Sequence, residues 1–361
     1  MPPRGRGTPT ISDVAQAAGV GRATVARTLG GYGAVSERTR IKVLAAAEEL
    51  GYRPNSVARS MATRRTQTIG VVLADVANPF FAEVLRGISA TTSQHGYDVL
   101  LISSEEEAER ERAAVDVLVN KLVDGMILAP SGGRRASVSH LAVLGERGIP
   151  LVLVDRTVDG LDADAVVINN RAVARDSVDE LVRNGHRRIG FLWGPTTSTA
   201  PPTLDELRDA VGTSLSSEGD RLLGYLDALE QAGIEPDPGL VSHVRPDEES
   251  AALTVESMLA MPHPPTAFLA TETSALTGML RALRAEGLRY PRDVSLIAFD
   301  DSPWAAVIEP PMTVVAQPAR RVGIEAASLL LRRMQNPTEA TVQVELAAEL
   351  AHRESVAAPK R

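Results

Sequence analysis

The stretch Thr10–Leu29, TISDVAQAAGVGRATVARTL, decides the fold of the amino-terminal region. Its GVGRAT segment resembles the glycine fingerprint of a dinucleotide site, but that fingerprint needs a preceding strand, and no strand pattern precedes it here. Apolar residues instead recur at i, i+3, i+4 and i+7 from Ile11, and Thr10 with Asp13 has the form of a capping box. The pattern predicts a short helix that ends at Gly19.

A second and a third helix are expected after this one. The second begins near Arg22 and turns Val25 and Leu29 inward. The third runs from Ser36, its N-cap, to Leu50. Two short helices joined by a tight glycine-containing turn describe a helix-turn-helix, so this region is expected to contact the phosphates of DNA rather than those of a cofactor.

The distribution of charge supports a DNA-binding head. Residues 1–65 carry a net charge of +7, and the rest of the chain carries −15. A basic head on an acidic body is typical of a DNA-binding domain joined to a second module. A solvated basic tail is the alternative, but the helical periodicity of this head does not fit a tail.

Composition limits the remaining classes of function. The chain has no cysteine, and its six histidines lie far apart without ligand spacing, so no disulfide, metal site or cofactor is expected. No apolar run approaches the roughly 20 residues of a membrane span, and no signal peptide pattern begins the chain. The expected protein is cytoplasmic, without membrane contact.

From Thr68 onward, short β-rich runs alternate with longer amphipathic stretches. The runs are TIGVVLA, YDVLLIS, DGMILAP, IPLVLVD, RRIGFLW, PTAFLAT and DVSLIAFD. Runs that are apolar on both faces predict parallel sheets covered by helices, and their number predicts two α/β subdomains with a ligand cleft between them. Sites in such folds lie at the carboxyl ends of strands, which here means Asp75–Phe81, Asp155–Arg156, the surroundings of Arg221, Thr271–Glu272 and Asp300–Trp304.

The sequence resembles the lactose-repressor/purine-repressor (LacI/GalR) family along nearly its full length. The motifs that carry the resemblance include TISDVAQAAGVGRATVARTL, VSERTRIKVLAAAEELGYRPNSVARSMAT, TIGVVLADVANPFFAEVLRGI, NGHRRIGFL, PRDVSLIAFDDSPWA and PPMTVVAQP. The resemblance implies a small all-α helix-turn-helix head and an α/β periplasmic-binding-protein-like core of two doubly wound parallel-sheet subdomains. It also implies that a small molecule bound in the core controls operator affinity.

The implied domains are a head over residues 1–53, a hinge helix and linker over 54–66, and an effector-binding and dimerisation core over 67–361. Within the core, the first subdomain is expected to comprise 67–167 and 299–326, and the second 168–298 and 327–361. One head makes few base contacts, so we expect a homodimer that reads a pseudo-palindromic operator.

The resemblance also assigns DNA-contacting residues. Base-facing positions fall on Arg22, Ala23 and Arg27, with phosphate contact as the alternative for the two arginines. The remaining assigned positions lie near the DNA backbone or in the hinge: Ser12, Thr24, Tyr32, Asn55, Val57, Ala58 and Met61. Met61 stands where the family usually places a leucine that wedges into the minor groove, and packing against the partner's hinge is its alternative role.

Effector contacts are assigned in the same way. The first group is Asp75, Asn78, Phe80, Arg221 and Asp300, and the second is Arg156, Asn169, Thr271 and Trp304. Carboxylates, an arginine fork and an aromatic ring suit a polyhydroxylated ligand such as a sugar or polyol. Thr271-Glu272 departs from the family's usual Asn-Asp pair, so the resemblance does not name the ligand. Trp304 either packs or stacks on the ligand.

Some residues and one segment are left outside the site. Asp301 and His186 are interpreted as structural. The segment between Gly194 and Arg221 is longer than the family norm and is either a lid over the ligand or a tolerated surface insertion.

The expected function is a ligand-responsive repressor of carbohydrate-related genes. A sugar-binding transport receptor shares the expected core, but the basic head and the missing signal peptide disfavour it. An enzyme on a doubly wound sheet is a second rival, and neither a nucleophile elbow nor a P-loop supports it.

Overall fold

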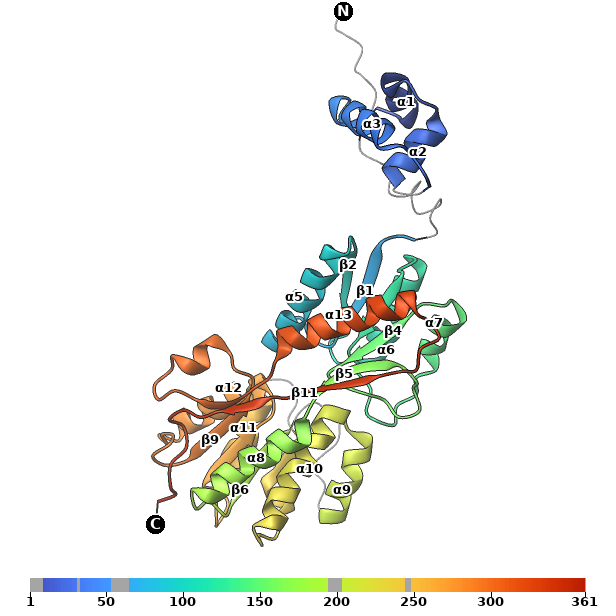
Figure 1. Ribbon diagram of the computed structural model, residues 1–361. Coiled ribbons are helices and arrows are strands. Elements are labelled where there is room, and N and C mark those ends of the chain that lie inside the picture. Colours follow the sequence, from blue (N-terminus) through green and yellow to red (C-terminus); the bar gives the residue numbers. More distant parts are fainter. Residues whose placement is uncertain (1–8, 31–32, 53–64, 194–202, 244–247, 361) are drawn as a thin grey trace, which may run out of the picture. The chain divides into compact units, whose positions relative to one another are not determined.

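The computed structural model describes residues 9–30, 33–52, 65–193, 203–243 and 248–360. These residues form two compact units, one before and one after the boundary between Gln67 and Thr68, and Figure 1 labels their helices and strands. No helix within the described ranges is both long and apolar enough to cross a membrane.

The amino-terminal unit is the expected set of three helices, namely α1 (Ile11–Ala18), α2 (Arg22–Gly30) and α3 (Glu37–Glu49). The predicted capping box of α1 is confirmed. The Thr10 side chain accepts the backbone N–H of Asp13, and Asp13 Oδ2 accepts the N–H of Thr10 at 2.8 Å. Gly19 ends the helix with φ 66°, in the left-handed region that favours glycine.

One buried valine from each helix holds this unit together. Val14, Val25 and Val43 are fully buried in a single apolar cluster. Each buried valine contributes roughly 1.5 to 3 kcal/mol relative to an exposed one. Because Val25 fixes one face of α2 inward, the opposite face of that helix is presented outward.

The first subdomain of the core is built on a six-stranded parallel sheet with the order β11-β5-β4-β3-β1-β2. Its strands are β1 (Thr68–Leu73), β2 (Asp98–Ser103), β3 (Gly125–Leu128), β4 (Leu151–Val154), β5 (Asp164–Ile168) and β11 (Gln343–Leu346). Its helices are α5 (Pro79–Gln94), α6 (Ala108–Asn120), α7 (Ala142–Glu146) and α13 (Ala319–Gln335). Val71 packs with α5 and α13 on one face and Val72 with α6 on the other, as the two-sided apolar pattern predicts.

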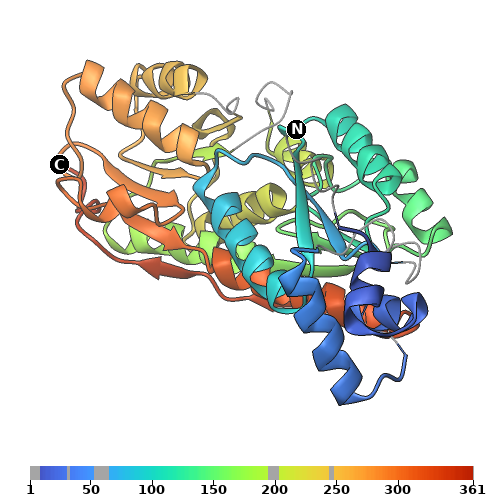
Figure 2. The ribbon, with the colours of Figure 1, turned by 90° about the horizontal axis from the view of Figure 1, so that it is seen from above.

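The second subdomain has its own six-stranded sheet, with the order β12-β10-β9-β8-β6-β7. Its strands are β6 (Ile189–Trp193), β7 (Val241–His243), β8 (Ala267–Ala270), β9 (Ser295–Phe299), β10 (Thr313–Ala316) and β12 (Glu349–Ala351). Its helices are α8 (Asn170–Arg183), α9 (Leu204–Thr213), α10 (Ser216–Gln231), α11 (Glu248–Leu259) and α12 (Thr273–Ala285). All its strand pairs are parallel except β10 with β12. Figure 2 shows the two subdomains side by side.

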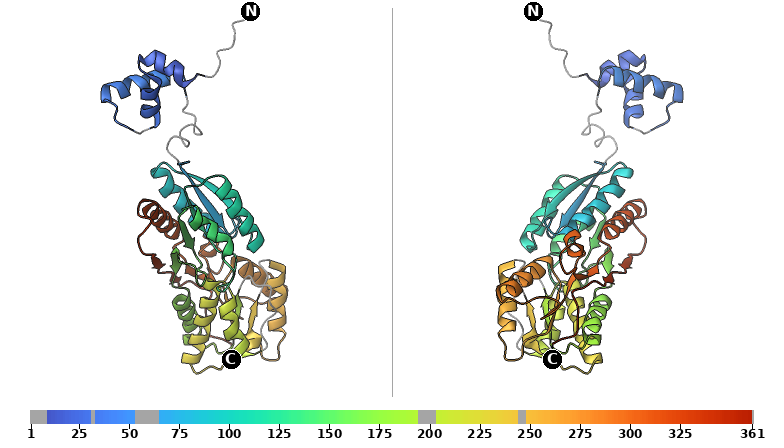
Figure 3. Two further views of the ribbon diagram at one scale, coloured as in Figure 1. Left: turned by 90° about the vertical axis from the view of Figure 1, so that its right-hand side faces the viewer. Right: turned by 90° about the vertical axis from the view of Figure 1, so that its left-hand side faces the viewer.

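The chain crosses between the subdomains three times, and the predicted division of residues 299–361 is partly wrong: β10 lies in the second subdomain, and the second half of α13 and β11 lie in the first. β10 pairs with β9 in the second sheet, whereas α13 packs across the first. β11 then pairs with β5, and β12 returns to β10 (Figure 3). The strands β11 and β12 are short, and their pairing partners lie far away in the sequence. Their own residue pattern therefore does not predict which sheet each of them joins.

Two glycines set the distance between α5 and α13. A Cβ on Gly323 would lie 2.0 Å from the carbonyl oxygen of Val84, and one on Gly87 would lie 2.2 Å from that of Arg320. The two helices therefore touch backbone to backbone. This contact anchors α13 to the first subdomain although β10, the strand that precedes it in the chain, belongs to the second.

Candidate functional site

The outward face of α2 carries the side chains expected to read DNA. Arg22, Ala23 and Arg27 are exposed, and Thr24 is half-buried. Arg27 Nε donates to the carbonyl oxygen of Ala23 at 3.2 Å, which holds the stem of Arg27 along the helix. The first turn of α2 has no acidic residue, so this face is basic.

The other assigned DNA contacts are only partly within the described residues. Ser12 is exposed on α1. The others, Tyr32, Asn55, Val57, Ala58 and Met61, lie outside the described residues, as does the hinge helix. Their roles stay predictions.

In the core, charged side chains gather where strands of the two sheets end. We call them the carboxyl-edge cluster: Glu106, Asp155, Arg156, Glu218, Arg221, Glu272 and Asp300. Glu106 follows β2, Asp155 and Arg156 follow β4, Glu272 follows β8 and Asp300 follows β9. Glu218 and Arg221 lie three residues apart on α10. This is the edge at which parallel α/β folds place their ligands.

Arg156 organises the part of the cluster that belongs to the first subdomain. Its two terminal nitrogens donate to Glu106 at 2.6 and 2.8 Å, in a bidentate pair. Its Nε donates to Asp155 Oδ2 at 3.1 Å, and Nη1 also donates to the carbonyl oxygen of Pro130 at 3.0 Å. The guanidinium lies 5.8 Å from the centre of the Phe81 ring. Arg156 thus joins the loops that follow β2, β3 and β4.

Arg221 has the same role in the second subdomain. Its Nη1 donates to Glu218 at 2.9 Å and to the carbonyl oxygen of Thr271 at 3.0 Å. Its Nε donates to Asn170 at the start of α8, at 2.8 Å. The guanidinium stacks over Phe299, 4.2 Å from the ring centre, a cation–π contact.

The two halves of the cluster face each other closely enough to shift each other's ionisation. Burial raises the pKa of Asp155, while Arg156 and also Arg221 of the other subdomain act to lower it. Burial and then Glu218 raise the pKa of Glu272 well above its usual range. Burial raises the pKa of Asp300 to about 6, against the opposing effects of Arg221 and the hydrogen bond from Gln317.

Two of these carboxylates sit on unusual backbone. Asp155 has φ 67° and Asp300 has φ 73°, both in the left-handed region. Aspartate is among the few residues that tolerate this conformation, and such positions concentrate at functional sites. Each strand therefore ends at the residue before an aspartate whose backbone turns away from the strand.

The sequence of both units matches known families. Residues 10–55 match the family described as bacterial regulatory proteins, lacI family. Residues 66–354 match the periplasmic binding proteins and sugar binding domain of the LacI family. The chain belongs to the LacI family. As a LacI-family member it is a sequence-specific DNA-binding transcriptional regulator and not an enzyme.

Individual LacI-family relatives agree over nearly the whole chain. The transcriptional repressor CytR of Escherichia coli (strain K12) is 33% identical over 90% of each chain. The solved complex of the regulator CelR with cellobiose is 33% identical, covers 96% of this chain and 99% of its own, and has a TM-score of 0.69. The lac repressor dimer bound to operator is 27% identical, covers 98% and 100%, and has a TM-score of 0.80.

The structure brings together four of the effector residues expected for this LacI-family core: Arg156, Arg221, Thr271 and Asp300. Thr271 donates to Glu218 Oε2 at 3.0 Å and so belongs to the Arg221 network. Asp300 accepts from Gln317 Nε2 at 2.6 Å. Their contact with an effector stays a prediction.

The remaining expected residues have structural partners. Asp75 Oδ1 accepts the N–H of Ala77 at 2.8 Å, and Asn78 caps α5 by accepting the N–H of Phe80 at 2.9 Å. The Phe80 ring is buried edge-on against Phe81. These residues follow β1, at the same edge as the cluster, so a second role toward the effector is compatible with the fold.

Asn169 and Trp304 have other partners among the described residues. Asn169 Oδ1 accepts the N–H of Ala348 at 2.8 Å, where the chain makes its third crossing. Trp304 packs against the apolar cluster of the second subdomain, which favours its packing role. His186 bonds to Thr266, and Asp301 pairs with Arg353, as expected for structural residues.

The residues that sequence reasoning missed are mostly carboxylates and amides: Glu106, Asn170, Glu218 and Gln317. Glu218 had a detectable signal, since it precedes Arg221 by three residues on a helix, a spacing at which opposite charges pair. Glu106 belongs to an acidic run directly after β2. Asn170 and Gln317 carry no sequence signal of this kind.

The described part of the long segment between Gly194 and Arg221 connects the subdomains. The helix α9 is followed directly by α10. Arg134, in the loop after β3, contacts the chain where these two helices join. Its backbone N–H donates to the carbonyl oxygen of Ser214 at 2.7 Å, and its side chain donates to Asp220 at 2.7 Å. A Cβ on Gly133 would lie 1.9 Å from the oxygen of Thr213. The lid and insertion alternatives both remain, because residues 194–202 lie outside the described ones.

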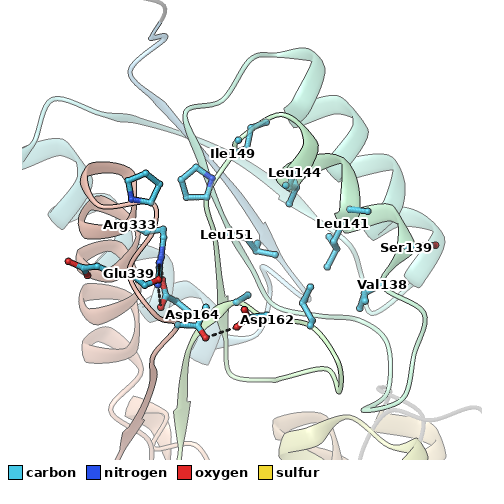
Figure 4. A pocket seen from close by; sticks show the side chains of 18 residues that line it. Val138, Ser139, Leu141, Leu144, Ile149, Leu151, Asp162, Asp164, Arg333 and Glu339 are labelled. Atoms are coloured by element: carbon cyan, nitrogen blue, oxygen red, sulfur yellow. Dashed lines mark hydrogen bonds and ion pairs between the residues drawn. The ribbon is translucent and has the colours of Figure 1, made fainter.

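A separate cavity of about 620 Å³ lies in the first subdomain, where β4 and β5 begin (Figure 4). Its walls are mainly apolar and include Leu141, Leu144 and Leu151. Its charged members also have partners: Asp164 pairs with Arg333 at 2.8 and 2.9 Å, Asp162 accepts from Thr341, and Glu339 lies 3.4 Å from Arg332. The cavity therefore offers apolar area but little to orient a polar ligand, and it lies at the strand edge opposite the carboxyl-edge cluster.

Proposed function

We propose that this regulator is a homodimeric repressor that reads a pseudo-palindromic operator through α2 and changes its operator affinity when a sugar or polyol binds the carboxyl-edge cluster. The observation that carries the proposal is the cluster itself, in which two arginine networks from different subdomains influence each other's ionisation. A ligand held by both networks stabilises one relative orientation of the subdomains, and its differential affinity for the two orientations becomes the signal.

A sugar is supported by the kind of groups present and by the relatives. The cluster combines carboxylates and arginines, which accept from and donate to hydroxyl groups. CelR was solved with cellobiose, and the core matches a sugar-binding family model. The lac repressor was solved as a dimer on its operator, which supports the same assembly here. We place the head at 1–53, the hinge at 54–66 and the effector core from 67 onward.

The effector assignment is tested with Asp300→Asn. Asparagine keeps the acceptor for Gln317 and tolerates the left-handed backbone, but it removes the negative charge. We expect operator affinity without effector to change less than about threefold, which is under about 0.7 kcal/mol, and the response to effector to be lost. Fluorescence anisotropy of labelled operator, with and without a panel of sugars and polyols, measures both. A variant that responds like the parent contradicts this site.

Replacing Arg22 with Ala tests the reading of bases by α2. If Arg22 bonds a guanine bidentately, the variant loses about 1 to 3 kcal/mol on the specific operator and the preference at one base pair per half-site. Competition between operators that differ at single positions measures this preference. Arg38→Ala, on α3, is the matched control, and its effect on affinity should be the same for all DNA sequences. Equal losses on specific and random DNA for Arg22→Ala would mean that it contacts only phosphate.

A further inference from the structure

The carboxyl-edge cluster holds more negative than positive groups. Among the described residues of the cluster, five carboxyl side chains, those of Glu106, Asp155, Glu218, Glu272 and Asp300, accompany two arginines, Arg156 and Arg221. The side chains of Glu218 and Asp155 are 1% and 6% exposed, and those of Glu106 and Glu272 are 17% and 20% exposed. Charges taken out of water are costly unless they are paired, so the ligand-free site is electrostatically incomplete.

The arginines are occupied by the protein's own acceptors. The bidentate pair with Glu106 and the bonds to Asp155 and Pro130 use most of the Arg156 donors. Arg221 donates to Asn170, Glu218 and Thr271. An anionic ligand would therefore have to displace existing ion pairs, while it met an excess of carboxylates.

Several acceptor atoms in the same cluster receive no hydrogen bond from any described residue. Asp155 Oδ1 is buried and has no hydrogen-bond partner among the described residues, although Asp155 itself is 6% exposed. The Glu272 carboxylate accepts no hydrogen bond from any described residue and approaches Arg221 only to 3.9 Å. Gln317 Oε1 is likewise buried without a partner in that part of the chain. A ligand at this site must bring hydrogen-bond donors.

We propose that the effector is a small polyhydroxylated cation, with a protonated amine held by the carboxylates of Asp155, Glu272 and Asp300. This inference rests on the proposed function, because it names the class of ligand for the same site. A hydroxyl donates one hydrogen bond and leaves the excess charge in place, whereas an ammonium group donates three and neutralises one carboxylate. Burial raises the pKa of all three carboxyl groups, and a cation beside them would act to lower it.

The test compares sugars that differ only at one substituent. Isothermal titration calorimetry of the full chain at neutral pH uses glucosamine, glucose and N-acetylglucosamine, the corresponding galactose set, and glucamine with sorbitol. In at least one set we expect the amine to bind at least tenfold tighter than its neutral counterparts. Glucose 6-phosphate and gluconate are the anionic probes and should bind most weakly. Magnesium and calcium chloride alone test whether an inorganic cation fills the site.

The variant Glu272→Gln tests whether the Glu272 carboxylate binds the protonated amine. The substitution keeps the shape of the side chain and removes its charge, so the preference for the amine over its neutral counterpart should fall at least tenfold. Glu109→Gln, on the exposed face of α6, is the control and should bind like the parent. Thermal unfolding checks that both variants are folded, and Glu272→Gln should unfold at a higher temperature than the parent because a carboxylate whose charge is disfavoured by burial becomes a neutral amide.

The outcomes separate this inference from the proposed function. Neutral sugars that bind as tightly as their amines would overturn the cationic effector and leave the sugar-responsive regulator standing. Tight binding of magnesium or calcium that Glu272→Gln abolishes would also overturn the amine. If none of the amines binds, the inference fails, and if no sugar or polyol changes operator affinity either, the proposed function fails with it.

Discussion

Replacing Arg221 with Met is expected to cost the core about 3 to 5 kcal/mol of unfolding free energy. The substitution leaves the Glu218 carboxylate, whose side chain is 1% exposed, without its 2.9 Å ion pair. It also removes the donor to Asn170 and the stacking on Phe299. Removing one partner of a buried pair costs more than the pair contributes, because the other charge stays buried alone.

Urea unfolding followed by tryptophan fluorescence measures this loss. Both tryptophans of the chain, Trp193 and Trp304, lie in the second subdomain with Arg221. Arg171→Met is the matched control. Arg171 makes a bidentate pair with Asp227, but the side chains are 56% and 33% exposed, so its loss should cost under about 1 kcal/mol.

A double variant checks the mechanism of this effect. Arg221→Met combined with Glu218→Gln removes both charges, and much of the lost stability should return. If Arg221→Met costs no more than Arg171→Met, the cluster is solvated and its charges are not buried in the way the structure indicates.

The stability of the ligand-free core is expected to fall as the pH rises from about 4 to about 6 on account of Asp300. Its carboxyl group titrates near the usual 3.8 when unfolded, but burial raises the pKa to about 6 in the folded chain. Between these values the folded state binds more protons than the unfolded state, so each rise in pH favours unfolding. The difference between the folded and unfolded pKa of this carboxyl group corresponds to about 2 to 3 kcal/mol of unfolding free energy.

Asp300→Asn isolates this contribution from those of other groups. The variant and the parent should be similar in stability near pH 4, and the variant should be more stable by about 2 kcal/mol above pH 6. Asp301→Asn is the control, because the adjacent Asp301 pairs with Arg353 and should gain nothing from the change. Parallel stability profiles for the parent and Asp300→Asn would exclude a raised pKa at Asp300. Together with the loss of effector response, a gain in stability would show that the cluster is kept for binding at the expense of stability.

Short-range features were predicted well from the sequence. The capping box of Thr10 and Asp13, the stop at Gly19 and the N-cap at Ser36 depend on residues within one helical turn, and all are present. The seven apolar runs are strands β1, β2, β3, β4, β6, β8 and β9. In the site, Arg156, Arg221, Thr271 and Asp300 could be predicted because each follows a strand or matches a family motif, and parallel strands place their ends at one edge.

The sequence by itself therefore determined the three-helix head, the alternation of strands and helices, and which strand ends carry polar groups, because these follow from contacts between near neighbours in the chain. Only the tertiary structure decided that α13 and β11 belong to the first subdomain while β10 and β12 belong to the second. It alone also decided that Glu106, Glu218 and Glu272, from three separate elements, meet around two arginines. The edge to which a short strand adds and the charges that a buried side chain meets are set by partners far away in the sequence. A local residue pattern does not contain those partners.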